Sequence, residues 1–460
     1  MVLNVNVKSV ILEARELKIS DQKTTSSIEI CDVIGCHLCE EPGGILPIFF
    51  GSAPYLVIKY ISKGKNYKWT AENVHVTGSR EECEALRTKV NEKLETERPK
   101  KLGLFINPIG GSQNSLNVYS KTIAPLFRAA NIVCDVMVSE RPKHIVDIMK
   151  SFDTTCVDGL VVVGGDGTLL EVINGLLTRA QKEAGLDYDK PTCKLKPLEV
   201  PIGIIPTGTG NGTAKGLYGN TDVVTAALHI IRGKTNRNNV QAVYSGGKLA
   251  SFSTIVIGCG LFSDLIYHTE RQRWLKKARY FVVPLHLMLF KKQRLFDAKL
   301  TIFQRHLTLY RDSTAEDADG TSEKSTTYEQ KGIWGICSAG GDFIAAVESK
   351  MDFITMNKHS QEINSFTLLV YKEAGRLPFL THFFQLMAFS LSAFQKDFLL
   401  PYTVRGYKVK IQCSDKSPDP ESEEVNINNL LDVDGELLDI VDGEYEVWNH
   451  RQLLRFYTSS

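Results

Sequence analysis

The chain has 460 residues, of which 43% are hydrophobic, so it can bury more than one hydrophobic core. Its 54 Lys and Arg residues nearly balance its 53 Asp and Glu residues, and the formal net charge is +1. This balance excludes a bulk field that would recruit nucleic acid or an anionic membrane over the whole surface, so any such contact must be local. Met1 to Lys8 contain no basic region followed by a long apolar stretch, and we therefore expect a cytoplasmic protein.

The chain contains ten cysteines without an evident disulfide framework, which favours reduced thiols. One small cluster could hold a metal ion. Its four candidate ligands lie within one short segment: Cys31, Cys36, His37 and Cys39. Zinc sites usually combine two separated ligand pairs, so zinc is not favoured here.

Residues 1–98 predict a small β domain that ends in a helix. Short β-prone pieces such as Ser9–Leu12 and Tyr55–Tyr60 are separated by Gly, Pro and Ser. Ser79 is a plausible N-cap for a helix with acidic residues in its first turn. The apolar face of this helix contains Leu86, Val90 and Leu94.

Residues 99–236 alternate strands and helices, which is typical of a parallel sheet covered by helices. The segment 179–198 is polar and contains proline, and we expect an excursion between a helix and a strand there. The expected strands are 104–106, 134–138, 160–163 and 201–205.

Residues 237–460 return to alternation at period two, which predicts a second β-rich domain. The polar segments 311–332 and 414–424 are expected to be insertions. The apolar segment 377–400 contains too many polar residues to span a membrane, so a buried or interfacial helix is favoured. The apolar run 281–290 suits an acyl-chain cavity or a membrane-facing lip, but a buried strand explains it equally well.

Three glycine-rich turns follow predicted strands: Asn107–Gly111, Val163–Thr168 and Pro206–Thr213. Glycines allow the backbone to approach a phosphate, and free N–H groups at a helix start bind anions. The third turn is neither a Walker P-loop nor a dinucleotide fingerprint. Asp166 in the second turn could be an ordinary helix cap, but a carboxylate beside phosphates also suggests phosphoryl transfer.

A carboxylate turn, Asp432–Glu436, lies far downstream. On spacing alone, an ordinary hairpin is the favoured interpretation of this turn.

The sequence from about Lys100 to the C-terminus resembles the diacylglycerol kinase catalytic family, in particular its sphingosine and ceramide kinase branch. The motifs Gly164-Gly165-Asp166-Gly167-Thr168 and Gly208-Thr209-Gly210-Asn211 carry the resemblance. It implies an α/β nucleotide-binding domain at 99–236 and a C-terminal β-sandwich lipid-binding domain at 237–460. The β domain at 1–98 would be pleckstrin-homology-like.

The resemblance also implies roles for individual residues. Asp166 would be the general base and would contact the lipid hydroxyl, Asp264 would bind the lipid head group, and Asp434 would help to hold Mg²⁺. The residues expected to contact ATP are Asn107, Pro108, Ile109, Ser139, Glu140, Arg141, Pro142, Lys143, Gly164, Gly165, Gly167, Thr168, Thr207, Gly208, Thr209, Arg273, Arg279, Asp434, Gly435 and Glu436. This reverses the hairpin interpretation of the carboxylate turn.

The resemblance favours ceramide as the acceptor, with peripheral membrane contact and no nucleic-acid partner. Segments 225–231 and 270–280, with the β domain before Lys100, look most like ceramide kinases. Two features depart from that pattern: Cys337 stands alone where ceramide kinases carry a cysteine-rich motif, and the Gly-Thr-Gly-Asn turn is closer to sphingosine and diacylglycerol kinases. A sphingosine kinase, a diacylglycerol kinase, an NAD kinase and a non-catalytic lipid-binding relative remain alternatives.

Overall fold

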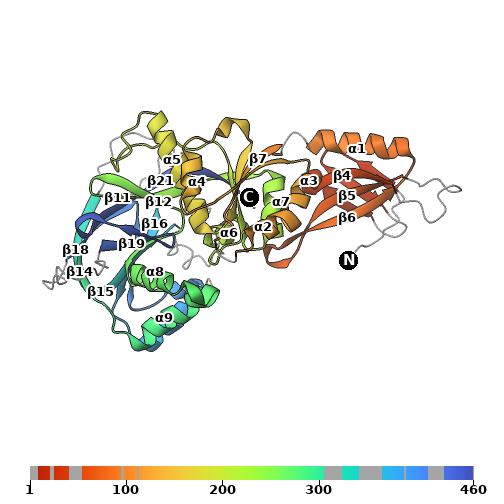
Figure 1. Ribbon diagram of the computed structural model, residues 1–460. Helices are drawn as coiled ribbons and strands as arrows, with labels where there is room; N and C mark the ends of the chain where they lie inside the picture. The colour runs from red at the N-terminus through yellow and green to blue at the C-terminus, as the bar shows by residue number, and fades with distance from the viewer. Residues whose placement is uncertain are drawn as a thin grey trace, which may run out of the picture. The chain divides into compact units, whose positions relative to one another are not determined.

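A computed structural model describes residues 9–20, 25–40, 54–94, 98–110, 113–304, 324–340, 365–387, 390–412 and 429–458 (Figure 1). The chain forms two compact units. The first comprises Met1–Thr168, Val200–Asn236 and Arg455–Ser460, and the second comprises Leu169–Glu199 and Arg237–Leu454.

The first unit begins with two antiparallel three-stranded sheets. One contains β1 (Ser9–Leu12), β2 (Glu16–Ser20) and β3 (Thr25–Glu29), and the other β4 (Val33–Glu40), β5 (Pro54–Lys63) and β6 (Trp69–Thr77). Helix α1 (Arg80–Leu94) follows and contributes to the same apolar core.

The predicted N-cap of α1 is confirmed. The Ser79 hydroxyl accepts a hydrogen bond from the Glu82 N–H at 3.2 Å, and the Glu82 carboxylate accepts one from the Ser79 N–H at 3.0 Å. This reciprocal capping box satisfies donors that the first turn of the helix would otherwise leave free.

The rest of the first unit is built on a parallel sheet in the order β8 (Val133–Val138), β7 (Lys101–Ile106), β9 (Gly159–Gly164) and β10 (Ile202–Pro206). The end of β21 (Glu444–Tyr457) pairs with β10. The predicted alternation of strands and helices is confirmed. The helices are α2 (Ser115–Val118), α3 (Ala124–Ala129), α4 (His144–Met149), the start of α5 (Asp166–Glu183), α6 (Gly212–Tyr218) and α7 (Val223–Arg232).

Specific contacts join the N-terminal sheets to the parallel-sheet part of the same unit. The Trp69 N–H donates to the Thr225 hydroxyl on α7 at 3.0 Å, and the Arg232 guanidinium pairs with Asp32 at 3.1 Å. Gly35 on β4 lies so close to the end of α3 that a Cβ there would be 1.9 Å from the Ala129 carbonyl oxygen. The lack of a side chain at Gly35 therefore permits this close approach.

The second unit is largely antiparallel, with a main sheet in the order β20, β19, β13, β15, β14, β18, β21. Side branches pair β16 with β15 and β17, and β11 with β12. The inward apolar side chains of these strands share one core. The bounds are β11 (Thr235–Ser245), β12 (Lys248–Ser253), β13 (Val256–Gly260), β14 (Phe296–Gln304), β15 (Lys324–Ala339), β16 (Phe366–Lys372), β17 (Leu399–Val404), β18 (Gly406–Gln412), β19 (Leu430–Val433) and β20 (Glu436–Asp439).

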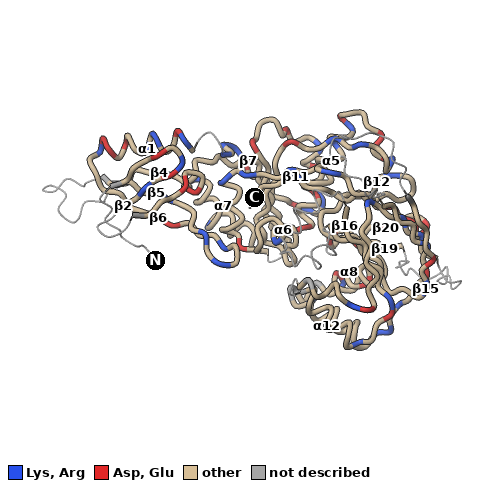
Figure 2. The backbone as a smooth tube through the Cα atoms, turned by 180° about the vertical axis from the view of Figure 1, so that it is seen from behind, with Lys and Arg blue, Asp and Glu red and all other residues tan. Residues whose placement is uncertain are grey.

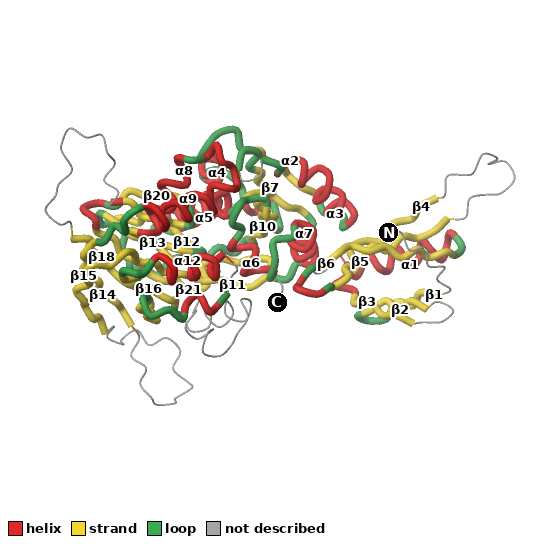
Figure 3. Tube along the Cα trace, turned by 90° about the horizontal axis from the view of Figure 1, so that it is seen from below, coloured by secondary structure: helices red, strands yellow, loops and turns green. Residues whose placement is uncertain are grey.

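Three helices of the second unit pack together: α8 (Leu261–Arg271), α9 (Arg279–Phe290) and α12 (Arg376–Met387), as the views from the front and from below show (Figures 1 and 3). A 3₁₀ segment, η5 (Arg273–Ala278), connects the first two. The alternative of a buried strand at 281–290 is thus wrong, because these residues form most of α9.

Three other predictions about this unit need correction. The apolar segment 377–400 is not one helix, since α12 ends at Met387 and β17 begins at Leu399. In the described part of the chain, no helix combines the length and apolar character needed to cross a membrane. The insertion predicted at 311–332 is wrong from residue 324 onward, where β15 begins, while 311–323 and 414–424 lie outside the described residues. Helix α5 also extends to Glu183, so the excursion predicted from residue 179 starts later.

Candidate active site

The parallel sheet brings together the turns predicted to bind phosphate. Strands β7, β8, β9 and β10 are parallel, so their carboxyl ends meet at one edge. Backbone hydrogen bonds connect the turns there: Ser139 N–H donates to the Ile106 carbonyl at 2.8 Å, and Thr207 N–H to the Gly164 carbonyl at 2.9 Å. Four segments that are distant in sequence thus form one backbone-rich site.

Asn107 organises the first turn and connects it to the second. Its side-chain oxygen accepts hydrogen bonds from the N–H groups of Ile109 at 3.1 Å and Gly110 at 3.0 Å. Its amide nitrogen donates to the Thr168 hydroxyl at 3.1 Å. Both ends of the Asn107 amide are therefore used to shape the site, which leaves Pro108 and Ile109 at the tip of the turn. Gly111 lies outside the described residues.

The second and third turns touch through their backbones at Gly165 and Gly208. A Cβ on Gly208 would lie 2.4 Å from the Gly165 Cα, and a Cβ on Gly165 would lie 3.0 Å from the Gly208 Cα. Neither position has room for a side chain. The glycines are thus required by the packing of one loop against the other as well as by the predicted approach of a phosphate.

Asp166 is the first residue of α5, and its carboxylate bonds to a different helix. One oxygen accepts from the Gly212 N–H at 2.9 Å and the other from the Thr213 N–H at 3.1 Å, both at the start of α6. A carboxylate has about four acceptor positions, so two further hydrogen bonds can form. Asp166 is therefore a helix cap with acceptor capacity remaining.

Two buried polar atoms beside Asp166 have no hydrogen-bond partner among the described residues. They are the side-chain oxygens of Asn211 and Thr213. A buried polar group without a partner costs free energy, and such groups gather where a ligand or ordered water completes the bonding. Asn211 has a left-handed backbone with φ of 56°, and its amide nitrogen donates to the Gly208 carbonyl at 3.0 Å.

Sequence reasoning missed Ser115 at the start of α2. Ser115 is fully buried, and its hydroxyl lies 2.8 Å from that of Thr207. Nothing in the sequence around Ser115 indicates that its side chain will meet a turn 92 positions away. Thr209, predicted for the same turn, is half-buried.

The turn 139–143 lies at the same sheet edge and is held by its own contacts. The Ser139 hydroxyl donates to the Arg141 carbonyl at 3.1 Å, and the Glu140 N–H bonds to His144 at 3.1 Å. The Arg141 guanidinium pairs with Asp147 at 2.6 Å, and Lys143 has a left-handed backbone just before α4. Pro142 lies between these two residues.

The predicted lipid-binding residue Asp264 belongs to the second unit, in the first turn of α8. Its two oxygens accept hydrogen bonds from the Arg294 guanidinium at 2.6 Å and 3.1 Å. This is a forked, charge-assisted pair, and both partners are largely shielded from solvent. Arg294 is a functional candidate that sequence analysis did not find.

The predicted phosphate-binding arginines are Arg273 and Arg279. The Arg279 guanidinium pairs with Glu270 at 2.9 Å and donates to the Tyr280 hydroxyl at 2.6 Å. An arginine engaged in this way has less capacity to bind phosphate than a free one. The side chain of Arg273 lies outside the described residues.

The Asp434 carboxylate is buried and accepts several hydrogen bonds from the turn between β12 and β13. Its donors are the Ser253 hydroxyl at 2.7 Å and the N–H groups of Thr254, Val256 and Ile255 at 2.8, 2.9 and 3.1 Å, with the Thr254 hydroxyl at 3.3 Å. Burial raises the pKa of Asp434, while these hydrogen bonds act in the opposite direction.

A magnesium ligand needs free carboxylate oxygen, which Asp434 lacks in this arrangement. The observed geometry therefore does not fit direct metal binding by Asp434. Asp434 and Gly435 form the two-residue turn between β19 and β20, with φ of 53° at Asp434 and 90° at Gly435, and Glu436 begins β20. The hairpin interpretation made from spacing alone thus describes the turn correctly.

The cysteine cluster near the N-terminus does not converge on one point. Cys36 and His37 are neighbours on β4, so their side chains leave opposite faces of the strand. Cys36 is in the apolar core, and His37 Nε2 bonds to the Ala129 carbonyl at 2.8 Å. Among the described residues, Glu29, Cys31 and Asp32 bring potential metal ligands near one another. However, the Arg232 guanidinium pairs with both carboxylates of this group.

Comparison with known proteins identifies the domain that contains the glycine turns. Residues 101–243 match the model of the diacylglycerol kinase catalytic domain. The chain is 34% identical to ceramide kinase of Homo sapiens over 231 residues, which are 49% of this chain and 43% of that protein. It is 34% identical to sphingosine kinase 1 of Arabidopsis thaliana over 200 residues, or 43% of this chain and 39% of that protein.

A longer match is more distant. The ceramide kinase-like protein of Homo sapiens is 27% identical over 403 residues, which are 79% of this chain and 69% of that protein.

The chain therefore contains a diacylglycerol kinase catalytic domain, and its curated relatives lie in the ceramide and sphingosine kinase branch. The matches to the two kinases cover less than half of each kinase.

Proposed function

We propose that this protein is a lipid kinase that transfers the γ-phosphate of ATP to the primary hydroxyl of a sphingoid lipid, with ceramide favoured. The observation that carries the proposal is the position of Asp166, with free acceptor capacity, among three interlocked glycine turns. Similarity to curated ceramide and sphingosine kinases supports the same reaction class.

In the proposed reaction, backbone N–H groups of the glycine turns and of the α5 N-terminus bind the phosphates. Asp166 accepts the proton of the lipid hydroxyl as that oxygen attacks the γ-phosphorus, and the bond between the γ-phosphorus and the β,γ-bridging oxygen breaks to release ADP. The hydrogen bonds from Gly212 and Thr213 fix the direction in which its remaining lone pairs point. No step is assigned to a metal at Asp434, because its oxygens are already engaged.

The test is Asp166→Asn, assayed with Mg²⁺-ATP and ceramide. Asparagine keeps one acceptor oxygen for the cap but cannot take a proton, so we expect kcat to fall by at least about a hundredfold. Asp222→Asn is the matched control, because Asp222 caps α7 by accepting the Thr225 N–H at 2.9 Å and lies in no predicted site. Normal turnover in Asp166→Asn would refute the proposed role. An equal decrease in kcat in both variants would mean that Asp166 acts only as a helix cap.

The Asp264–Arg294 pair supports ceramide over sphingosine. Sphingosine carries a cationic amine, whereas the corresponding nitrogen of ceramide is a neutral amide. The guanidinium of Arg294 already neutralises Asp264, so a second cation would gain little and would be repelled by Arg294. A neutral amide or hydroxyl can still bond to a free lone pair of the carboxylate.

Arg294→Gln tests this selectivity, with Arg294→Lys as the charge-preserving control. Removing the positive charge should raise kcat/KM for sphingosine relative to ceramide by about tenfold or more, which corresponds to about 1.4 kcal/mol. The lysine variant should keep the original preference. An unchanged ratio in the glutamine variant would contradict the argument, provided that the protein phosphorylates ceramide at all.

We also propose that η5, α9 and α12 contact a membrane surface. Their large apolar side chains include three that are more than 70% exposed: Trp274 at 75%, Phe290 at 72% and Leu377 at 71%. Exposed Lys291, Lys292 and Arg376 lie next to the ends of these helices and could meet anionic head groups, and Figure 2 shows basic residues in this region.

A double change of Phe290 and Leu377 to Ser should reduce sedimentation with anionic vesicles without changing activity on detergent-dispersed ceramide. Retained sedimentation would exclude this surface.

The N-terminal part is proposed to be pleckstrin-homology-like and the 237–460 part a β-sandwich that binds the lipid. Two three-stranded sheets followed by a capped C-terminal helix support the first assignment, and the shared antiparallel core supports the second. Limited proteolysis that releases a stable fragment ending near residue 98 would support the first boundary.

A further inference from the structure

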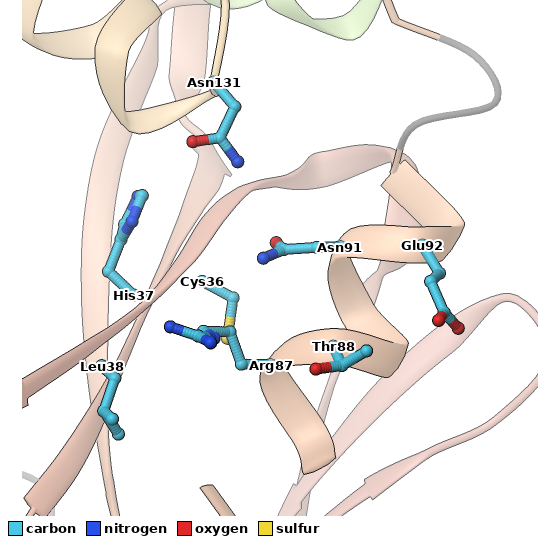
Figure 4. Close-up of a pocket in the computed structure, with 8 residues that line it drawn as sticks. All are labelled: Cys36, His37, Leu38, Arg87, Thr88, Asn91, Glu92 and Asn131. Atoms are coloured by element: carbon cyan, nitrogen blue, oxygen red, sulfur yellow. The ribbon is translucent and has the colours of Figure 1, made fainter. Parts of the chain in front are cut away.

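A polar cavity in the first unit lies apart from the glycine turns. It has a volume of about 420 Å³ and opens between β4, α1 and the turn after α3 (Figure 4). Its walls are Cys36, His37, Leu38, Arg87, Thr88, Asn91, Glu92 and Asn131. The volume falls within the range of sites that bind small molecules. Since the walls come from both the N-terminal sheets and the parallel-sheet part, a ligand here would bridge the two.

Arg87 is the cation of this cavity, and it has no carboxylate partner in the described structure. Glu84, one turn earlier on α1, pairs instead with Arg80 at 3.1 Å. Glu92 also lines the cavity, but Figure 4 shows it pointing away from the space into which Arg87 and Asn91 point. A half-buried guanidinium with five donors and no acceptor is suited to bind an oxyanion.

Asn91 adds a second requirement. Its side-chain oxygen is buried and has no hydrogen-bond donor among the described residues. Asn131 points into the same space from the turn after α3, and its backbone is left-handed with φ of 58°. A ligand that satisfies these groups must accept hydrogen bonds at Arg87 and Asn131 and donate one at Asn91.

Three other residues that line the cavity carry no negative charge that would repel an anion, and hydrogen bonds hold two of them in place. Burial raises the pKa of the Cys36 thiol to about 12, so this side chain carries no negative charge. The Thr88 hydroxyl is engaged with the Glu84 carbonyl at 3.0 Å. His37 is fixed by its bond to the Ala129 carbonyl at 2.8 Å, which also holds β4 against the end of α3.

We propose that this cavity is an accessory binding site for a phosphate monoester that also carries a hydroxyl group. The phosphate oxygens would bond to Arg87 and Asn131, and the hydroxyl would donate to the Asn91 oxygen. Such chemistry occurs both in soluble phosphorylated polyols and in lipid head groups, and the experiment separates these sources. The inference does not depend on the proposed kinase reaction.

The full chain is titrated with glycerol 3-phosphate by calorimetry, and its sedimentation is measured with phosphatidylcholine vesicles that contain lysophosphatidic acid, whose head group has a phosphate monoester and a free hydroxyl. We expect Arg87→Gln to weaken binding of at least one probe by tenfold or more. Asn131→Gly removes the amide while permitting the left-handed backbone, and it should also weaken binding. Lys89→Gln, an exposed change on the same helix that does not line the cavity, should remain within twofold of the original protein.

Arg87-dependent binding of glycerol 3-phosphate would identify a soluble ligand, and Arg87-dependent binding of vesicles alone would identify a head group. Thermal unfolding of each variant checks that it is folded. If the folded Arg87→Gln and Asn131→Gly variants bind both probes as the original protein does, or if the original protein binds neither, the proposal is overturned.

Discussion

Replacing Gly208 with alanine should damage the candidate nucleotide site without unfolding the protein. The new Cβ would lie 2.4 Å from the Gly165 Cα, whereas ordinary contact begins near 3.4 Å, so the two turns must separate by about 1 Å. The same Cβ would lie 2.8 Å from the Asn211 side-chain oxygen, so the Asn211 side chain would have to move as well. A misplacement of about 1 Å in a reacting geometry can cost about a hundredfold in rate, and overpacking typically costs about 1–3 kcal/mol in stability.

Steady-state kinetics with ATP and ceramide, together with thermal unfolding, measure both effects. We expect kcat/KM for ATP to fall by about a hundredfold. Gly216→Ala on α6 is the control, because its Cβ would meet nothing within 4 Å and alanine favours the helix. Gly216→Ala should therefore keep full activity. If Gly208→Ala kept its affinity for ATP and its turnover, the contact between the turns would not matter to the site.

Two further predictions concern stability. His382 is buried between the Ala393 carbonyl and the Tyr371 hydroxyl, and burial lowers its pKa from 6.5 to about 4. The neutral His382 therefore contributes its full stabilisation of the folded state above pH 6.5, and this contribution is lost as the pH falls toward 4. When the pH is lowered from 7 to 5, the free energy of unfolding measured in urea should fall by about 2 kcal/mol less in His382→Phe than in the original protein. Equal decreases in the two proteins would contradict this prediction. The Asp434 carboxylate accepts hydrogen bonds from five donors, and Asp434→Asn leaves only one side-chain oxygen to accept them. This change should lower the free energy of unfolding, measured by heat or urea, by about 1–3 kcal/mol. The control Asp439→Asn, at an exposed position, should leave it almost unchanged.

The sequence predicts the parallel sheet well because doubly buried strands and strand-to-helix glycine turns are local patterns. Strand β9 is buried throughout, and the run of Val161 to Val163 signals this directly. The order of strands was not predictable from these patterns, so neither were the contacts of Gly165 with Gly208 or of Ser115 with Thr207. These contacts depend on which turns the sheet places side by side.

The helical part of the second unit shows where periodicity fails. Residues 281–290 are almost entirely apolar, so neither a helix nor a strand pattern is distinguishable. The exposed side chains on both α9 and α12 explain why: a helix with apolar residues on its outer face has no polar stripe to reveal its period. Arg294 was missed for a related reason, because a basic residue after an apolar run gives no indication that it will pair with Asp264, 30 positions earlier.

The sequence suggests capping and catalysis as alternative roles for Asp166, but the geometry is compatible with both. The carboxylate does not cap its own helix; it accepts N–H groups from the start of α6, which follows the third glycine turn. A general base must hold a fixed direction, and two N–H donors from a separate element fix it more firmly than solvent could. The same bonds tie the second turn to the third, next to the contact between Gly165 and Gly208. A change that loosens either turn should therefore disturb phosphate binding and proton transfer together, and kcat and the KM for ATP should change jointly in Gly208→Ala.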